Sequence, residues 1–227
     1  NLEHSLKERL FKGKAILLYG PRQVGKTTLV KLLLSSEENS VLMLNGDDAD
    51  SRALLKDATA PKIKSITGTK TILFLDEAQR FENIGLLIKI IVDQLPEIQV
   101  IATGSSAFEL ADRIKESMAG RIFEFQLFPI SYSEMVNHHT AITERRLLTQ
   151  RLLYGYYPEI ITNQGDATEL LYSLVDSALY KDILTIEQIR KPVLIQKLLR
   201  ALALQVGQEV SFNEIAQLIG SNRETVE

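Results

Sequence analysis

One stretch near the start of the chain, Ile16 to Leu29, constrains the fold more than any other. An apolar run, Ala15 to Tyr19, leads into GPRQVGKT, and an amphipathic run follows. The eight residues fit the pattern G-x-x-x-x-G-K-[ST], and the flanks predict a buried strand before the motif and a helix after it. Gly20 and Gly25 allow the backbone to curl so that several N–H groups point inward. The alternative is a glycine-rich turn that matches by chance, and the flanking strand and helix argue against it.

A loop of this kind is suited to holding phosphate, because its N–H groups and the positive end of the next helix dipole attract anions. Lys26 can reach the β- and γ-phosphates of a nucleoside triphosphate, and the Thr27 hydroxyl can bind Mg²⁺. Arg22 can instead shape the loop or meet a partner. We expect the nucleotide to be bound by Gly20, Pro21, Arg22, Gln23, Val24, Gly25, Lys26, Thr27 and Thr28.

Apolar segments alternate with helical patterns along the first half of the chain. This alternation predicts an α/β fold in which helices cover both faces of a parallel sheet, giving three αβα layers. Ligands of such sheets bind beyond the carboxyl ends of the strands. The expected further strands are Ser40–Asn45, Thr71–Asp76, Gln99–Thr103 and Arg121–Leu127, and the expected helices include Leu2–Phe11, Asp50–Lys56 and Asn83–Leu95.

Two adjacent acids end the third of these strands. We expect Asp76 to hold Mg²⁺, because this hard cation prefers oxygen ligands. Glu77 is placed to orient or deprotonate a water that attacks the γ-phosphate. A strand that ends in two solvated acids is the alternative, and the complete motif upstream favours the functional interpretation.

Further catalytic candidates follow the fourth strand. In Thr103-Gly104-Ser105, a hydroxyl can sense the γ-phosphate or the attacking water, and we prefer Ser105 over Ser106; an ordinary strand-ending turn is the alternative. A cation that stabilises the transition state can come from the same chain or from a neighbouring subunit. Arg121 is the first candidate and Arg113 the second, each against the alternative of a solvated arginine.

The second half of the chain has a mostly helical pattern. Ser131 and Glu134 predict a capping box at the start of a short helix. We place the ATPase core at 1–129, a helical lid at 130–190 and the start of a winged-helix-like domain at 191–227. The expected helices are Glu144–Tyr154, Thr168–Leu184 and Pro192–Val206.

The tail, Ser211 to Glu227, has the spacing of a helix-turn-helix. Its second helix is cut off at Glu227, so we expect a truncated chain. The missing helix can contact DNA, or the unit can be a small packing module that reports nucleotide state or binds protein. We expect Phe212, Ile215, Ala216 and Ile219 to form the core of the unit, and Val226 fits the start of the next helix.

Composition excludes several classes of function. The net charge of −3 gives no global argument for nucleic-acid binding, and the absence of cysteine excludes disulfides, zinc ribbons and thiol catalysis. No apolar run reaches the length of about 18 residues that a membrane helix needs, so we expect a cytoplasmic protein without a membrane partner.

The segments GPRQVGKTTL, ILFLDEAQR, VIATGSS and AGRIFEFQLFPISYSEM together resemble one group of AAA+ P-loop ATPases, the predicted bacterial and archaeal ATPases related to origin-recognition and STAND-type proteins. The resemblance runs from about Leu6 to Asp182. It implies adenine rather than guanine, a helical lid after the sheet, and a winged-helix unit in the tail. It also implies that Lys26, Thr27, Asp76 and Glu77 are the ATP and Mg²⁺ residues and that Ser105 is the sensor.

Two functions remain open. The first is a Mg²⁺-dependent ATPase that couples hydrolysis to rearrangement of its helical and winged-helix regions. The second is a slow nucleotide-gated switch or DNA-binding module that holds ATP or ADP tightly. Partners beyond ATP are DNA through the helix-turn-helix, another protein, or a second copy of the chain.

Overall fold

The computed structural model describes residues 2–104, 120–178 and 192–226. The chain divides into two compact units, Asn1–Leu174 and Val175–Glu227. Among the helices of the described ranges, none combines the length and the apolar character that a membrane crossing requires.

A five-stranded parallel sheet forms the centre of the first unit, with the strand order β2-β3-β4-β1-β5. The chain therefore crosses from β1 to the far edge of the sheet and returns, which leaves β4 between β1 and β3. In this register Leu18 of β1 lies opposite Thr103 of β4. The strands are β1 (Ala15–Tyr19), β2 (Val41–Asn45), β3 (Ile72–Asp76), β4 (Gln99–Gly104) and β5 (Ile122–Gln126).

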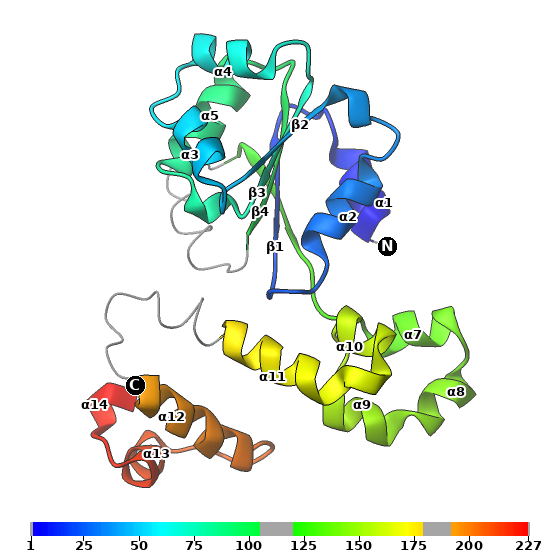
Figure 1. Ribbon diagram of the computed structural model, residues 1–227, viewed down its shortest axis with the longest axis vertical. Coiled ribbons are helices and arrows are strands. Elements are labelled where there is room, and N and C mark those ends of the chain that lie inside the picture. Colours follow the sequence, from blue (N-terminus) through cyan, green and yellow to red (C-terminus); the bar gives the residue numbers. More distant parts are fainter. Residues whose placement is uncertain (1, 105–119, 179–191, 227) are drawn as a thin grey trace. The chain divides into compact units, whose positions relative to one another are not determined.

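Helices cover both faces of this sheet, as predicted (Figure 1). Side chains alternate along a strand, so Ile16 and Leu18 join one buried cluster, with Leu6 and Val30, and Leu17 joins the other. The first face is covered by α1 (Leu2–Arg9) and α2 (Lys26–Leu33), and the second by α3 (Ala49–Leu55), α4 (Ala60–Thr67) and α5 (Ile84–Gln94). Short 3₁₀ turns lie at η1 (Glu38–Ser40) and η2 (Ala78–Arg80).

Short helices follow the sheet. The predicted capping box is present, since the Ser131 hydroxyl accepts from the Glu134 N–H and the Glu134 carboxylate accepts from the Ser131 N–H. The predicted single helix Glu144–Tyr154 is wrong, because it is interrupted at Leu147 and forms two helices. The elements are α7 (Tyr132–His138), α8 (Ala141–Arg146), α9 (Leu148–Tyr154), α10 (Pro158–Thr162), η3 (Gln164–Asp166) and α11 (Ala167–Ala178). The remainder of the predicted helix Thr168–Leu184 lies outside the described residues.

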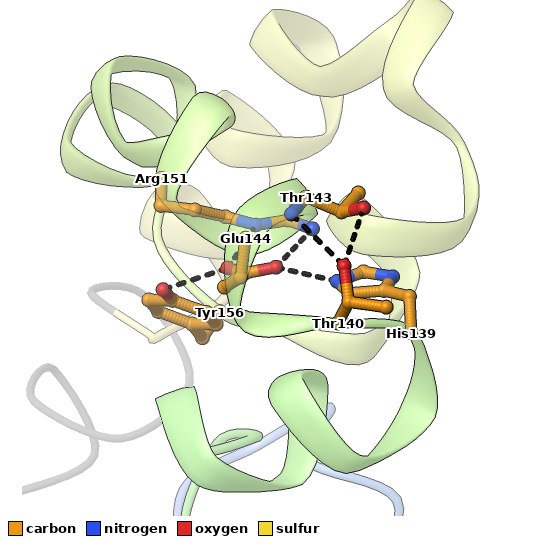
Figure 2. A network of polar contacts seen from close by, with 6 residues as sticks. All are labelled: His139, Thr140, Thr143, Glu144, Arg151 and Tyr156. Atoms are coloured by element: carbon orange, nitrogen blue, oxygen red, sulfur yellow. Dashed lines mark hydrogen bonds and ion pairs between the residues drawn. The ribbon is translucent and has the colours of Figure 1, made fainter.

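A buried carboxylate connects α7, α8 and α9 (Figure 2). Glu144 is 0% exposed, and one of its oxygens accepts from Arg151 Nε and from the Tyr156 hydroxyl, each at 2.9 Å. His139 Nε2 lies 2.7 Å from the other oxygen. Desolvation raises the pKa of Glu144, but hydrogen bonds from Arg151, His139 and Tyr156 outweigh it and lower the pKa to about 2. The Tyr156 carbonyl also accepts from the Ile130 N–H at 3.0 Å, which ties the turn before α10 to the segment after β5.

The second unit contains a helix-turn-helix arrangement, with α12 (Pro192–Leu204), α13 (Phe212–Ile219) and α14 (Arg223–Val226). Ile215 and Ile219 are buried together with Ala201, as a helix-turn-helix core requires, and Val226 packs against them. The prediction of Phe212 as a core residue is wrong, because its side chain is 47% exposed. The predicted domain boundaries and the winged helix stay predictions.

Candidate functional site

The loop that joins β1 to α2 begins at a glycine that no other residue can replace without a shift. A Cβ atom on Gly20 would lie 2.0 Å from the Leu127 carbonyl oxygen. The approach is this close because the Leu127 N–H donates to the Tyr19 carbonyl at 2.8 Å, extending the pairing of β5 with β1. The start of the loop is therefore fixed against the end of β5.

The loop curls back before α2 through left-handed backbone at Gln23, with φ 60°, and at Gly25, with φ 94°. Gly25 is the N-cap of α2 and makes no side-chain cap bond. The N–H groups of the first turn and the positive end of the helix dipole are thus available to an anion. Val24 is buried beneath the loop, with 4% exposure, whereas the side chain of Thr28 is exposed.

Lys26 is buried inside this curl, with 6% exposure. Its Nζ donates to the Gly20 carbonyl at 2.9 Å and to the Pro21 carbonyl at 2.7 Å. The ammonium group is therefore held within the loop that follows β1, where a phosphate chain would lie. Burial of this charge is tolerated because the loop carbonyls accept its hydrogen bonds.

The two predicted metal ligands meet at the carboxyl ends of the strands. The Thr27 hydroxyl lies 3.0 Å and 2.9 Å from the two carboxylate oxygens of Asp76. Asp76 is 6% exposed, and its Oδ1 also accepts from the Thr103 hydroxyl, at 2.5 Å. Because β4 lies between β1 and β3, residues 49 positions apart in the chain are brought to one point.

These oxygen donors fit Mg²⁺. A hydroxyl and a carboxylate within 3.0 Å of each other are hard ligands of the type that this ion prefers. No group of three or more His, Cys, Asp or Glu residues that could hold a metal occurs in the ranges that the structure describes. Mg²⁺ is usually held by one or two protein ligands together with substrate phosphates, so this sparse donor set agrees with a nucleotide-bound ion.

Thr103 has a position that the sequence did not assign. It belongs to the segment in which a sensor hydroxyl was expected, but its own hydroxyl donates to Asp76 and its side chain is 0% exposed. A threonine that follows the apolar run 100–102 was the available signal. Thr103 therefore orients the carboxylate, while the preferred sensor Ser105 lies outside the described residues.

Glu77 follows Asp76 in left-handed backbone, with φ 48° and ψ 48°. Its Oε2 accepts from Gln79 Nε2 at 2.6 Å. Gln79 is 8% exposed and sits in the η2 turn, so it holds the Glu77 carboxylate from a fixed position. Gln79 was not predicted, because a lone glutamine two residues after an acidic pair carries no specific signal.

Arg121 lies where the strands of the sheet begin, at the end opposite the phosphate loop. It immediately precedes β5, its carbonyl accepts from the Ala15 N–H at the start of β1, and its Nε contacts Asp93 at 2.7 Å. Strand β5 has five residues, which at about 3.3 Å each separates Arg121 from the loop by roughly 16 Å. This distance leaves Arg121 away from the phosphate loop of its own chain, and its role as a catalytic residue, in its own chain or toward a second chain, stays a prediction. Arg113 lies outside the described residues.

A parallel sheet with a glycine-bounded loop, a buried lysine, and a threonine–aspartate pair at its carboxyl edge defines a P-loop nucleotide-binding domain. An AAA domain family model matches residues 12–136, which span this sheet. The chain belongs to this AAA family, which confirms its resemblance to AAA+ P-loop ATPases. A second model, a domain of unknown function (DUF8612), matches residues 145–227.

Relatives occur in archaea and bacteria. An uncharacterized protein of Methanocaldococcus jannaschii, MJ1544, is 24% identical over 96% of this chain and 53% of its own length. An uncharacterized protein of Mycobacterium tuberculosis, Rv2008c, is 31% identical over 52% of this chain and 25% of its own length. The replication factor C large subunit of Methanococcus vannielii is 35% identical over 29% of this chain and 14% of its own length. The chain thus spans about half of the archaeal relative MJ1544.

Solved structures also align with the chain. AMPPCP-bound DnaA from Aquifex aeolicus covers 99% of this chain and 83% of its own, with 15% identity and a TM-score of 0.42. A DNA replication initiation factor covers 97% of this chain and 82% of its own, with 18% identity and a TM-score of 0.38. The family assignment rests on the domain model rather than on these structures.

Proposed function

We propose that this chain binds ATP with Mg²⁺ and hydrolyses it, and that the nucleotide state controls its helical and helix-turn-helix regions. The observation that carries the proposal is the contact of the Thr27 hydroxyl with both oxygens of Asp76, at 3.0 Å and 2.9 Å. A phosphate loop alone supports nucleotide binding. An adjoining carboxylate at the same sheet edge adds the metal ligand that phosphoryl transfer needs.

Each residue of the nucleotide site has a separate role in this proposal. The loop amides and Lys26 would bind the phosphates, and Thr27 and Asp76 would hold the Mg²⁺, which would supply positive charge against the negative charge of the phosphates. Glu77 orients a water for attack and accepts its proton. Gln79 restricts where the Glu77 carboxylate can lie, because their contact is 2.6 Å.

A second candidate is a slow nucleotide-gated switch. It is favoured by the position of Arg121, which faces Asp93 at the end of the sheet opposite the phosphate loop of its own chain. An arginine from a second copy, or DNA contact through α13 and α14, would then be needed for turnover. The similarity to a replication factor C large subunit supports testing DNA as the activator.

One assay separates the two functions. Steady-state phosphate release is measured with ATP and Mg²⁺, with and without duplex DNA, for the wild type, Glu77→Gln and the exposed control Glu169→Gln. We expect slowed release for Glu77→Gln with unchanged ATP affinity, and wild-type behaviour for Glu169→Gln. Equal release by Glu77→Gln and the wild type would remove Glu77 from the mechanism. Tight nucleotide retention with negligible release by the wild type, even with DNA, would establish the switch.

A further inference from the structure

The amino edge of the sheet, opposite the phosphate loop, carries a concentration of positive charge. Residues 7–14, KERLFKGK, contain four cations and one acid in a chain whose net charge is −3. The segment spans the end of α1 and the turn into β1, and it lies against β5 through Phe123. We call this surface the basic ridge; it consists of Lys7, Arg9, Phe11, Lys12, Lys14 and Phe123.

The four cations of the basic ridge lie close together in the chain and have no acidic partner among the described residues. Within the part of the chain that the structure describes, no carboxylate forms an ion pair with Lys7, Arg9, Lys12 or Lys14. The nearby acid Glu8 contacts His4 instead. By contrast, Lys56, Lys64, Arg80 and Arg121 each face an acid. The ridge therefore presents positive charge that this fold does not neutralise.

An aromatic ring lies among these cations. Arg9 Cζ lies 4.8 Å from the centre of the Phe123 ring, and Lys14 Nζ lies 5.0 Å from it. Both distances are within the range of cation–π attraction. The ring therefore holds two long, otherwise flexible cations in place, which lowers the entropy that they lose when they bind an anion.

A second aromatic side chain, that of Phe11, is exposed, and its backbone has a strained conformation. Phe11 is 54% exposed and has φ 56°, a left-handed conformation that phenylalanine rarely adopts. The buried side chain of Gln99 maintains it, since Oε1 accepts from the Phe11 N–H at 2.6 Å and Nε2 donates to the Lys14 carbonyl at 3.0 Å. Strained residues persist only where their surroundings enforce them, and they concentrate at functional sites.

We propose that the basic ridge binds single-stranded nucleic acid, with phosphates on the four cations and a base stacked on Phe11. Proteins that bind single strands combine a positive track with exposed aromatic rings, because every base offers a face for stacking. A duplex hides its base faces, so an exposed ring favours the single strand. All residues of the basic ridge belong to the first unit, and none of them belongs to the helix-turn-helix or to the phosphate loop.

The test is fluorescence anisotropy of the whole chain with a labelled oligothymidylate of about 20 nucleotides. Four phosphate contacts on a single strand predict a roughly 50-fold loss of affinity between about 50 and 200 mM salt. Lys7→Ala with Lys12→Ala removes two of these contacts and reduces that loss to roughly sevenfold. The matched control, Lys31→Ala with Lys62→Ala, changes the net charge equally at exposed positions on α2 and α4 and should behave as the wild type.

The stacking contact has its own variant. Phe11→Gly removes the ring while placing glycine in a conformation that it adopts readily, so the fold is retained. We expect a fivefold to 150-fold loss of oligonucleotide affinity, as for loss of one stacked base, with ATP affinity unchanged. Tyr172→Ala, at an exposed aromatic on α11, is the control and should leave both affinities unchanged.

Three results would overturn the proposal. The first is no oligonucleotide binding by the wild type at about 50 mM salt. The second is equal binding by the wild type and the Lys7→Ala, Lys12→Ala variant, which would place the contact elsewhere, such as on the helix-turn-helix. The third is retention of the chain on anionic phosphatidylserine vesicles without oligonucleotide binding, which would make the ridge a lipid-binding surface.

Discussion

Replacing Glu144 by glutamine keeps the size of this buried side chain but removes the charge around which three partners are arranged. Arg151 Nε, the Tyr156 hydroxyl and His139 Nε2 all lie within 2.9 Å of its oxygens. Arg151 is 5% exposed, so the substitution leaves a buried guanidinium without a counter-charge. An isolated charge of this kind is destabilising by about 3–5 kcal/mol when its pairing partner is removed.

The pKa of Glu144 gives a separate measure of the same effect. Desolvation opposes ionisation, but the hydrogen bonds prevail and lower the pKa from 4.5 to about 2 in the folded protein. The ionised form is therefore favoured in the folded state by at most about 3 kcal/mol. Because the neighbouring His139 side chain is 25% exposed, water reaches the edge of the network and screens part of this energy.

The sign of the pH dependence follows from the lowered pKa. Stabilisation by Glu144 is fully present above its unfolded-state pKa of about 4.5, and it is lost as the pH falls toward about 2. The difference in stability between the wild type and Glu144→Gln should therefore be largest at neutral pH and shrink across that acidic interval. Chemical denaturation followed by circular dichroism, repeated at several pH values, measures this difference.

Two comparisons make the result specific. Glu169→Gln is the same substitution at an exposed helical position and should leave stability nearly unchanged at every pH. Replacing the pair together, Glu144→Leu with Arg151→Met, should recover much of the stability at neutral pH, because apolar residues often replace buried ion pairs without loss. A constant difference between wild type and Glu144→Gln from pH 7 to pH 2 would refute the assignment of the acid sensitivity to this carboxylate.

Further predictions concern the nucleotide site. Gly20→Ala places a Cβ 2.0 Å from the Leu127 carbonyl oxygen. We expect chemical denaturation to show a loss of stability of about 1–3 kcal/mol, and nucleotide titration to show weaker ATP binding. The control Gly165→Ala adds a Cβ in open space and should have little effect on either measurement. Thr103→Val removes a hydrogen-bond donor to Asp76 at nearly constant side-chain volume. It should weaken Mg²⁺-dependent ATP binding by roughly tenfold or more, as for loss of a hydrogen bond to a charged group. An unchanged affinity in calorimetric titration would contradict the role of Thr103 in orienting the Asp76 carboxylate.

Much of the nucleotide site was predictable because its signals are local. The spacing of Gly20, Lys26 and Thr27 is written in eight consecutive residues, and Asp76 ends an apolar strand that is equally plain. Their meeting point also follows from the rule that parallel strands present their carboxyl ends at one edge. The strand order was not predicted, and it is the order that places Thr103 between them.

Other features depend on contacts that no local pattern encodes. The Glu144 network joins side chains from four segments, so its members look like ordinary surface residues in the sequence. The interruption at Leu147 divides a pattern whose apolar periodicity continues through it. Arg121 was chosen for its neighbours in sequence, and the parallel pairing of β5 with β1 places it where these strands begin, at the end of the sheet opposite the phosphate loop.

The two edges of this sheet have different chemistry, and β1 connects them. Lys14 of the basic ridge precedes β1 and Gly20 of the phosphate loop follows it, with Ile16, Leu17 and Leu18 buried between β4 and β5. A close-packed central strand has no second arrangement to adopt, so it cannot transmit a conformational change by itself. Coupling between the two sites would have to use an element that can move. Binding at either site would then change the affinity of the other site by the same factor. Within this sheet the fold favours two independent sites, one for a nucleotide and one for a polyanion.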